Sequence, residues 1–503
     1  MTNLGMRQSV SAAPRPAGGP DPQSRLKEAG ITAGRNSLFL VLAQAGGKLA
    51  ALLVFLLLVR YLSVAEVGKF SFALTFVGIF SALTDWGIST WMMREVSRRR
   101  GEASRWFSAA LYARVVTFAL WATAGLGIAW ATKVPVNTWV IILILFLAML
   151  PDVLGQTLGF LFLAFERAGA SALLTGLTDW SRLLFVFAIL HLAPGLSHVA
   201  WSYALATFVA ALVVYLTMAR KLVGLMVRPS LDDLKKVARG GVPFLLVGVF
   251  FRIYFRADTI LLAYLKGDYS VGTYNAAYKL MEALIFIPAA FMGAIFPLLA
   301  RSFERDADQF RAGCRMAIRV LASMGFPLGV GTMLIAPKLI ARLYGPQYDS
   351  SALYLQVLIW TASLIFLNAT FPASLNAVGR EKYSLAAVVT GIVLNIAGNL
   401  ILIPRLDALG AAIMTVATEV YSTLLYLHFF RRFLFSPGIL GLVWRPLLAS
   451  AFMGLAVYWA LSWPLTAVVG LGVLSYTLCL AAIGGIRRQE VELGLAVLKL
   501  SRG

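Results

Sequence analysis

The chain has 503 residues, of which 60% are hydrophobic and only 13% are charged, and its formal net charge is +21. A soluble protein has roughly 25% charged residues, so this composition excludes an ordinary soluble domain. The apolar residues come in runs of about 20, long enough to cross a bilayer as helices, and the short alternating segments of an outer-membrane barrel are missing. The sequence therefore predicts an all-α polytopic membrane protein.

Residues 1–35 differ from the rest of the chain. They are rich in Pro, Gly and Ala with scattered charge, so we expect a disordered cytoplasmic tail. No apolar core of roughly 7–15 residues precedes position 36, which argues against a cleavable secretory signal. The first span is then expected to target the protein to the membrane.

Fourteen apolar segments follow in chain order, and they predict fourteen transmembrane helices. Their expected ranges are 36–60, 67–91, 106–131, 138–164, 169–192, 198–219, 241–265, 269–299, 313–337, 349–375, 383–404, 409–430, 441–462 and 464–485. They divide into an N-lobe (36–219, spans 1–6), a basic cytoplasmic linker (220–240), a C-lobe (241–432, spans 7–12), two further spans (433–486) and a cytoplasmic tail (487–503).

The connections alternate in charge. Even-numbered connections are basic, and their Lys and Arg residues are Arg94, Arg98, Arg99, Arg100, Arg105, Arg220, Lys221, Arg228, Lys235, Lys236, Arg239, Arg301, Arg305, Arg311, Arg380, Lys382, Arg431 and Arg432. Odd-numbered connections are poor in such residues. The positive-inside rule then places both termini in the cytoplasm. This topology accounts for the basic charge, so we expect no nucleic-acid partner.

Two stretches about 200 residues apart are alike. "RYLSVAEVGKFSFALTFVG" starts at Arg60 and "AYLKGDYSVGTYNAAYKLME" starts at Ala263, and they align Gly68 with Gly272, an offset of 272 − 68 = 204. That period fits a six-span repeat of about 34 residues per span, as in transporters built from two halves. Both halves enter the membrane in the same direction, which predicts a pseudo-two-fold axis along the membrane normal. Gly68 and Gly272 are expected in equivalent tight turns on the external side.

Several charged residues lie inside predicted spans, where each costs roughly 2.5–3.5 kcal/mol. Arg252 and Arg256 are four residues apart and share a helix face, and Lys48 also lacks a nearby acid. Lys279 has Glu282 three residues away. Unpaired cations in the membrane need an anion, and the arginine fork suits phosphate. We therefore predict Lys48, Arg252, Arg256 and Lys279 as substrate-binding residues; the alternative is that they pair with distant acids such as Asp152 or Glu419.

Other intramembrane charges have structural explanations. Asp179 and Arg182 can pair within one helix, and Asp85 and Arg114 can pair between adjacent spans. Asp152 follows Pro151 and can organise a proline kink, or it can have a functional role. Glu419 is isolated and receives no assignment.

Catalytic motifs are missing. The sequence has no P-loop, no nucleophile–base arrangement and no metal-ligand spacing, and its only cysteines, Cys314 and Cys479, give no disulfide framework. We expect a protein that is not an enzyme, without metal or cofactor, whose energy comes from a gradient or from another protein.

The run "LLLVRYLSVAEVGKFSFALTFVGIFSALTDWGIST" resembles the first hairpin of the oligosaccharide flippases, the Wzx-like polysaccharide-transporter branch of the multidrug/oligosaccharidyl-lipid/polysaccharide exporter superfamily. "FRADTILLAYLKGDYSVGTYNAAYKLMEAL" resembles the start of their second half, with Asp258, Gly272, Tyr274 and Ala277 at the usual places. The resemblance covers roughly residues 36–435.

The resemblance implies two six-helix lobes around a central cavity that opens alternately to either side, lined by spans 1, 2, 7 and 8. It also implies a polyprenyl-diphosphate-linked oligosaccharide as substrate, moved to the outer leaflet of a bacterial inner membrane for O-antigen or exopolysaccharide biosynthesis. Asp258 and Glu282 are the candidates for ion coupling. Membrane lipids, a polysaccharide polymerase and chain-length machinery are the expected partners. The alternatives are a lipid II flippase, a cation-coupled drug or metabolite exporter, and a polytopic glycosyltransferase or polymerase.

Overall fold

The computed structural model describes residues 22–223 and 226–485, and in these ranges it contains helices and no strands. The α-helices are α1 (Pro22–Tyr61), α2 (Val64–Asp85), α3 (Ile88–Arg98), α4 (Ala103–Ala131), α5 (Val136–Ala164), α6 (Ala168–Leu192), α7 (Leu196–Val223), α8 (Leu231–Lys266), α9 (Asp268–Arg305), α10 (Ala307–Leu343), α11 (Asp349–Asn368), α12 (Thr370–Ala377), α13 (Glu381–Leu406), α14 (Ala408–Phe433), α15 (Ile439–Trp459) and α16 (Leu465–Ala482). The predicted all-α class is confirmed.

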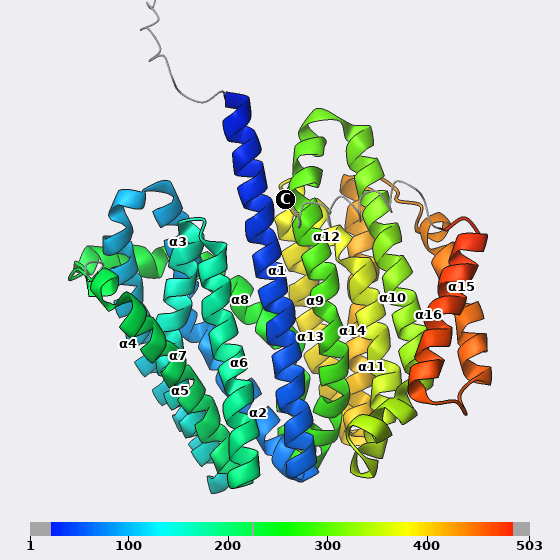
Figure 1. Cartoon of the computed structure of the whole chain (residues 1–503), viewed down its shortest axis with the longest axis horizontal. Coiled ribbons are helices and arrows are strands. Elements are labelled where there is room, and N and C mark those ends of the chain that lie inside the picture. Colours follow the sequence, from blue (N-terminus) through cyan, green and yellow to red (C-terminus); the bar gives the residue numbers. More distant parts are fainter. Residues whose placement is uncertain (1–21, 224–225, 486–503) are drawn as a thin grey trace, which may run out of the picture.

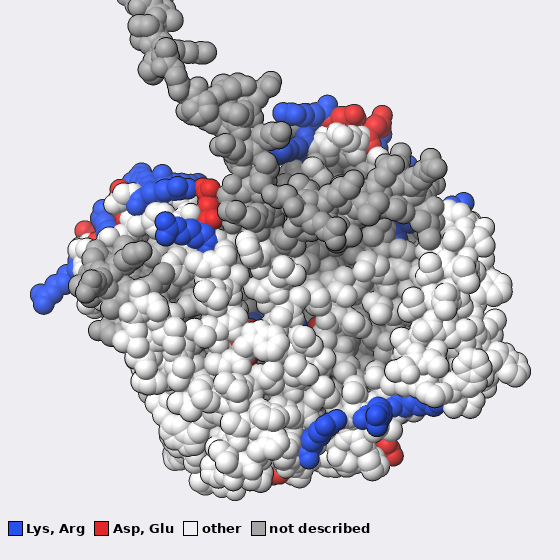
Figure 2. All heavy atoms as spheres, viewed as in Figure 1, with Lys and Arg blue, Asp and Glu red and all other residues white. Residues whose placement is uncertain are grey.

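The bundle has the character of a multi-pass membrane protein. Thirteen helical segments of the described chain are long and apolar enough to span a bilayer. The 36-residue α8, which contains the predicted span 241–265, is not among them, so thirteen of the fourteen predicted spans meet this criterion. Charged side chains gather at the two ends of the molecule, and the belt between them is almost free of charge (Figure 2).

The helices form two groups side by side. In Figure 1 the helices α2–α7 lie on the left, α9–α14 lie on the right, and α15 and α16 cover the outer edge of the right-hand group. One hydrophobic cluster is confined to the first group and the start of α8, and another to residues 292–443. The helices α1, α2, α8 and α9 meet between the groups and share the largest cluster. This arrangement favours the predicted lobes, 36–219 and 241–432.

Two predicted boundaries are wrong. The helix α1 begins at Pro22, well inside the predicted 1–35 tail, of which residues 1–21 lie outside the described ranges. The predicted linker 220–240 is largely helical, because α7 continues to Val223 and α8 begins at Leu231. The predicted tail 487–503 lies outside the described residues.

The start of α8 is held by specific contacts. Ser230 caps the helix through a capping box with Asp233. Arg105 of α4 donates to the Asp233 carboxylate from Nε at 2.9 Å, and this hydrogen-bonding lowers the pKa of Asp233 to about 2. These contacts fix the connection between the two halves against the first helix group.

Two predicted spans are interrupted. The expected span 67–91 is split into α2 and α3, because Trp86 (φ 50°) and Gly87 (φ 68°) have left-handed backbone conformations. The expected span 349–375 is split into α11 and α12 near Ala369; Pro372 lacks the N–H that would continue the helix. A helix break at a proline can be predicted from the sequence, whereas a break at a tryptophan with a left-handed backbone conformation cannot.

Gly68 and Gly272 lie within the first turns of α2 and α9, not in the tight turns that the sequence predicted. A Cβ on Gly68 would lie 1.8 Å from the Asp268 carbonyl oxygen, and a Cβ on Gly272 would lie 2.2 Å from the Val64 carbonyl oxygen. The two contacted residues, Val64 and Asp268, are separated by the same offset as the two glycines, since 268 − 64 = 204. Each half of the repeat therefore makes the same contact with the other half. Such reciprocity is the mark of a two-fold contact. The glycines are required for close approach of two backbones.

A substitution at either glycine tests this contact. Gly68→Ala and Gly272→Ala must push α2 and α9 apart, and overpacking typically costs roughly 1–3 kcal/mol. We expect each variant to lower the melting temperature of the purified protein in detergent. Gly293→Ala is the matched control, because a Cβ there in α9 meets nothing within 4 Å. Equal melting temperatures for all three variants would contradict the contact.

Candidate functional site

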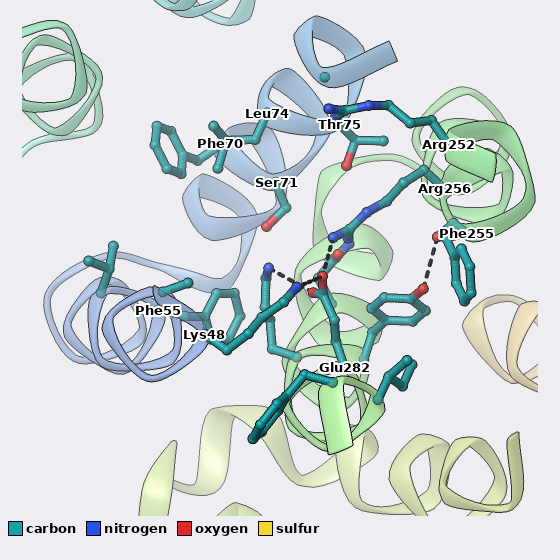
Figure 3. Close-up of a pocket in the computed structure, with 18 of the residues that line it drawn as sticks. Lys48, Phe55, Phe70, Ser71, Leu74, Thr75, Arg252, Phe255, Arg256 and Glu282 are labelled. Atoms are coloured by element: carbon teal, nitrogen blue, oxygen red, sulfur yellow. Dashed lines mark hydrogen bonds and ion pairs between the residues drawn. The ribbon is translucent and has the colours of Figure 1, made fainter. Parts of the chain in front are cut away.

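A cavity of about 600 Å³ lies between α1, α2, α8 and α9, where the two helix groups meet. Most of its wall is apolar and includes Val54, Phe55, Leu58, Leu74 and Phe251. Five charged residues also line it: Lys48 from α1, Arg252 and Arg256 from α8, and Lys279 and Glu282 from α9 (Figure 3). The structure thus brings together all four residues that the sequence predicted to bind substrate.

Glu282 is the centre of this charged group. Its Oε1 lies 2.9 Å from Arg256 Nη2 and 3.2 Å from Lys48 Nζ, and its Oε2 lies 2.9 Å from Lys279 Nζ (Figure 3). One carboxylate therefore contacts three cations on three helices. The sequence-based expectation that Lys48 and Arg256 lack an acid is wrong, because the acid comes from α9, 234 positions from Lys48 in the chain.

Arg252 differs from its neighbours. It forms no ion pair with any residue in the described ranges, and its side chain extends towards α2, where a Cβ on Gly78 would lie 3.5 Å from Nη1. The glycine leaves room for the guanidinium. Four cations and one carboxylate give the cavity lining a formal charge of +3.

Arg256 is held in place from two sides. Besides its ion pair with Glu282, its guanidinium lies over the Tyr278 ring, 5.2 Å from the centroid. Tyr278 in turn donates a hydrogen bond to the Phe255 carbonyl at 2.9 Å. A guanidinium fixed in this way keeps its fork orientation, which suits bidentate binding of a phosphate.

Asp258 faces away from the cavity, as expected for a residue on another face of α8. Its buried carboxylate accepts hydrogen bonds from the Tyr274 hydroxyl and from the Thr259 backbone N–H at 2.8 Å. The Thr415 hydroxyl of α14 lies 3.4 Å from it. Asp258 therefore belongs to the interior of the second helix group.

Glu419, which received no assignment from its sequence position, lies in the same interior. It accepts hydrogen bonds from Tyr254 at 2.8 Å and Asn368 at 2.6 Å. It shares a small enclosed pocket with Asp258, Asn395 and Thr418. Sequence analysis missed this polar group, although asparagines in the middle of apolar spans are a usable signal for it.

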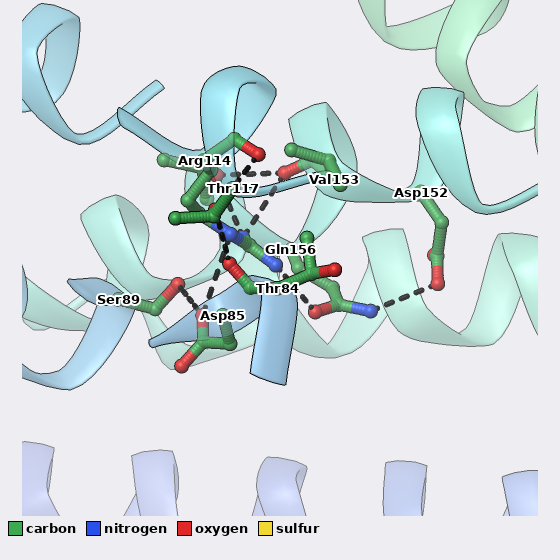
Figure 4. A network of polar contacts seen from close by, with 9 residues as sticks. Thr84, Asp85, Ser89, Arg114, Thr117, Asp152, Val153 and Gln156 are labelled. Carbon is green, nitrogen blue, oxygen red and sulfur yellow. Dashed lines mark hydrogen bonds and ion pairs between the residues drawn. The ribbon is translucent and has the colours of Figure 1, made fainter. Parts of the chain in front are cut away.

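A second polar network lies in the first helix group (Figure 4). The Arg114 side chain is only 1% exposed, and its Nε lies 3.4 Å from the Asp85 carboxylate. Its guanidinium also donates hydrogen bonds to Thr157 at 2.8 Å and to Gln156 at 3.0 Å. Gln156 donates to Asp152 at 2.8 Å. The structure therefore places the predicted partners Asp85 and Arg114 together and links Asp152 to them through Gln156.

Asp179 and Arg182 also lie together, with 3.5 Å between Oδ1 and Nη1 on α6. Both line a cavity of about 260 Å³ that Asp152 shares. Within the described ranges, no group of three His, Cys, Asp or Glu side chains is arranged to hold a metal ion.

The fold and the charged interior cavity are those of a multi-pass membrane protein. The chain belongs to the polysaccharide biosynthesis protein family, whose model matches residues 33–303, more than half of the chain. The MatE family model also matches, over residues 243–401.

Curated relatives match part of the chain. A protein named probable flippase AglR from Haloferax volcanii is 29% identical over 175 residues, which cover 33% of this chain and 36% of that protein. A putative O-antigen transporter from Shigella dysenteriae is 27% identical over 192 residues, 37% of this chain and 46% of that protein. The chain spans between about a third and a half of these relatives.

Solved structures match the whole bundle. The lipid II flippase MurJ in an inward closed conformation aligns with a TM-score of 0.74 at 13% identity, covering 89% of this chain and 98% of that chain. An inward-facing multidrug resistance MATE family transporter aligns with a TM-score of 0.62 at 16% identity, covering 78% and 95%. At these identities the likeness shows the fold.

The buried Arg114 network predicts a large effect on stability. Arg114→Met removes a buried guanidinium, so that Thr157 and Gln156 lose their hydrogen-bond donor and the part-buried Asp85 loses its cation. Each hydrogen bond to a charged group contributes roughly 1.5–3 kcal/mol. We expect Arg114→Met to lower the melting temperature in detergent far more than Arg182→Met, whose ion pair is about one-quarter exposed. Similar melting temperatures for the two variants would show that the network contributes little.

Proposed function

We propose that this protein is a flippase that moves a polyprenyl-diphosphate-linked oligosaccharide across the membrane by alternating access. The observation that carries the proposal is the cation excess in an apolar cavity between two helix groups. Its family and the names of its relatives, a flippase and an O-antigen transporter, support the same activity.

The diphosphate would bind in two steps. Arg252, which has no ion pair among the described residues, offers the first contact for a phosphate. The second phosphate would then compete with the Glu282 carboxylate for Arg256, Lys48 and Lys279. In a low-dielectric cavity, exchange of one anion for another costs far less than exposing the cations without a partner. Glu282 thus offsets part of the positive charge of the empty site until substrate arrives.

This exchange couples binding to movement. Lys48 lies on α1 and Glu282 on α9, so their ion pair joins the two helices. A phosphate that takes Lys48 from Glu282 releases this link, and α1 can then separate from α9. The apolar tail would stay in lipid between the groups, while the sugars occupy the cavity.

We assign ion coupling to Asp258 rather than to Glu282. Glu282 is occupied by three cations, whereas Asp258 is buried among hydroxyl and amide donors without a cation within ion-pair distance in the described residues. Binding of a proton or a metal cation there would change the packing of α8 against α14.

The basic end of the bundle is proposed to face the cytoplasm of a bacterial cell, with both termini on that side, in the inner membrane. A polysaccharide polymerase and chain-length machinery remain proposed partners. Among the alternatives, a lipid II flippase also carries a diphosphate lipid, and the cavity chemistry fits it. A drug exporter for cations is disfavoured, because a cavity with a formal charge of +3 repels such substrates.

The topology is directly testable. Lys235→Cys, at the basic start of α8, should react with a membrane-impermeant thiol reagent only after cells are opened. Gly195→Cys, in the opposite connection between α6 and α7, should react in intact cells. Labelling of position 235 in intact cells would overturn the orientation.

The proposed phosphate site predicts a graded loss of activity. Arg256→Lys should lose much of the activity although it keeps the charge, because lysine lacks the bidentate fork. The Arg252→Ala/Arg256→Ala double variant and Lys48→Ala should lose nearly all of it. Complementation of surface glycan in a deletion strain measures this, with immunoblots to check membrane expression.

Arg98→Ala is the control for this series, because Arg98 pairs with Glu95 on the exposed side of α3 and lies outside the cavity. It should leave glycan export near normal. Normal export by the well-expressed double variant would rule out the proposed site. Identification of the lipid-linked glycan that accumulates in the deletion strain separates an oligosaccharide flippase from a lipid II flippase.

A further inference from the structure

A second basic cavity, of about 870 Å³, lies at the end of the bundle that carries the basic connections, between α9, α10 and the start of α15. Arginines from both helices of the α9–α10 hairpin line it. On α9 these are Arg301 and Arg305, and on α10 they are Arg315 and Arg319. Each pair is spaced by four residues, so each projects from one helix face. Two antiparallel helices thus present arginines to one cavity, which we call the basin.

Three of these arginines have no acidic partner among the described side chains. None of the described residues that line the basin is acidic, and no ion pair with a described side chain is formed by Arg301, Arg305 or Arg315. Arg315 lies over the Phe435 ring at 5.6 Å, which fixes its direction. By contrast Arg311, on the same hairpin, pairs with Asp308 at 3.1 Å and does not line the basin.

Apolar residues of α9, α10 and α15 also line the basin. They include Ile295, Leu298, Leu299, Met316 and Leu442, and Leu298 is 57% exposed. The arginines follow these residues towards the end of α9, so the basin lies where the apolar belt meets the charged rim. A ligand that fits both the arginines and the apolar residues of the basin has a phosphate group and an acyl chain. Basic pockets between helices at this depth bind lipid head groups.

We propose that this basin binds the head group of an anionic phospholipid from the leaflet at the basic end. The phosphate lies between the two arginine pairs, and an acyl chain runs along Leu298. The site is separate from the central cavity, because Arg301 lies 19 residues beyond Glu282 on α9, roughly 28 Å along the helix. The inference therefore stands apart from the proposed transport activity.

Native mass spectrometry of the full-length protein in detergent tests the proposal, with phosphatidylglycerol and phosphatidylcholine as probes. Each arginine near an anionic lipid contributes about a fivefold gain in binding, so Arg301→Gln/Arg305→Gln should weaken phosphatidylglycerol binding roughly 25-fold. Phosphatidylcholine binding should stay unchanged. Arg301→Lys/Arg305→Lys should retain most of the binding, since lysine keeps the charge and serves as a point-charge phosphate ligand.

Arg98→Gln/Arg311→Gln is the matched control, because it removes two charges from the same end of the bundle without touching the basin. Equal losses in this control, or equal affinities for the two lipids in the unchanged protein, would overturn the proposal. Inorganic pyrophosphate added in competition distinguishes the source of the phosphate. Full displacement of phosphatidylglycerol by pyrophosphate at micromolar concentration would identify a soluble phosphate compound as the ligand and reject the lipid.

Discussion

The central constraint is the placement of four cations inside an apolar bundle beside a single carboxylate. Lys48, Arg256 and Lys279 all contact Glu282, and Arg252 has no ion pair within the described residues. Burying a charge without a partner is costly, so α1, α8 and α9 have to keep three of the cations next to Glu282. The same excess of positive charge makes the empty cavity an anion site.

This charged centre depends on the contact between α2 and α9. Because Gly68 and Gly272 allow the two backbones to touch at one end, the two helix groups are joined there and the cavity forms next to the joint. Gly68 of α2 contacts Asp268 of α9, and Gly272 of α9 contacts Val64 of α2, so the 204-residue offset relates one contact to the other. The internal repeat thus places two equivalent close contacts next to the cavity.

Much of the fold could be predicted from the sequence. Apolar length predicted fourteen spans, of which thirteen are long and apolar enough in the described chain, because this signal depends on local composition. The repeat identified Gly68 and Gly272 as an equivalent pair. Helix interruptions such as Trp86–Gly87 were missed, since they depend on packing against the backbone of α8 around Gly241. The position of the α1 start was also missed, because Pro and Gly residues suggested disorder.

Within the site, the sequence identified which cations are inside the membrane, but it could not find their acid. Glu282 was visible only as the neighbour of Lys279, and its contacts with Lys48 and Arg256 arise from three helices that converge in space. The interior group of Glu419, Asn368 and Tyr254 was missed for the same reason. Contacts within one helix, and a contact between adjacent spans such as Asp85–Arg114, could be predicted from the sequence. Contacts between helices far apart in the chain need the packing.

The central claim is that Glu282 pairs with the cations of the empty site and competes with the phosphate for them. One binding measurement tests this claim most directly. Titration of the purified protein with a short polyprenyl diphosphate should give tighter binding for Glu282→Gln than for the unchanged chain, because the competing anion is gone. Glu95→Gln, which removes a carboxylate at the rim, should bind as the unchanged chain does. Weaker binding by a folded Glu282→Gln variant would contradict the account, since it would mean that Glu282 supports the ligand rather than competing with it.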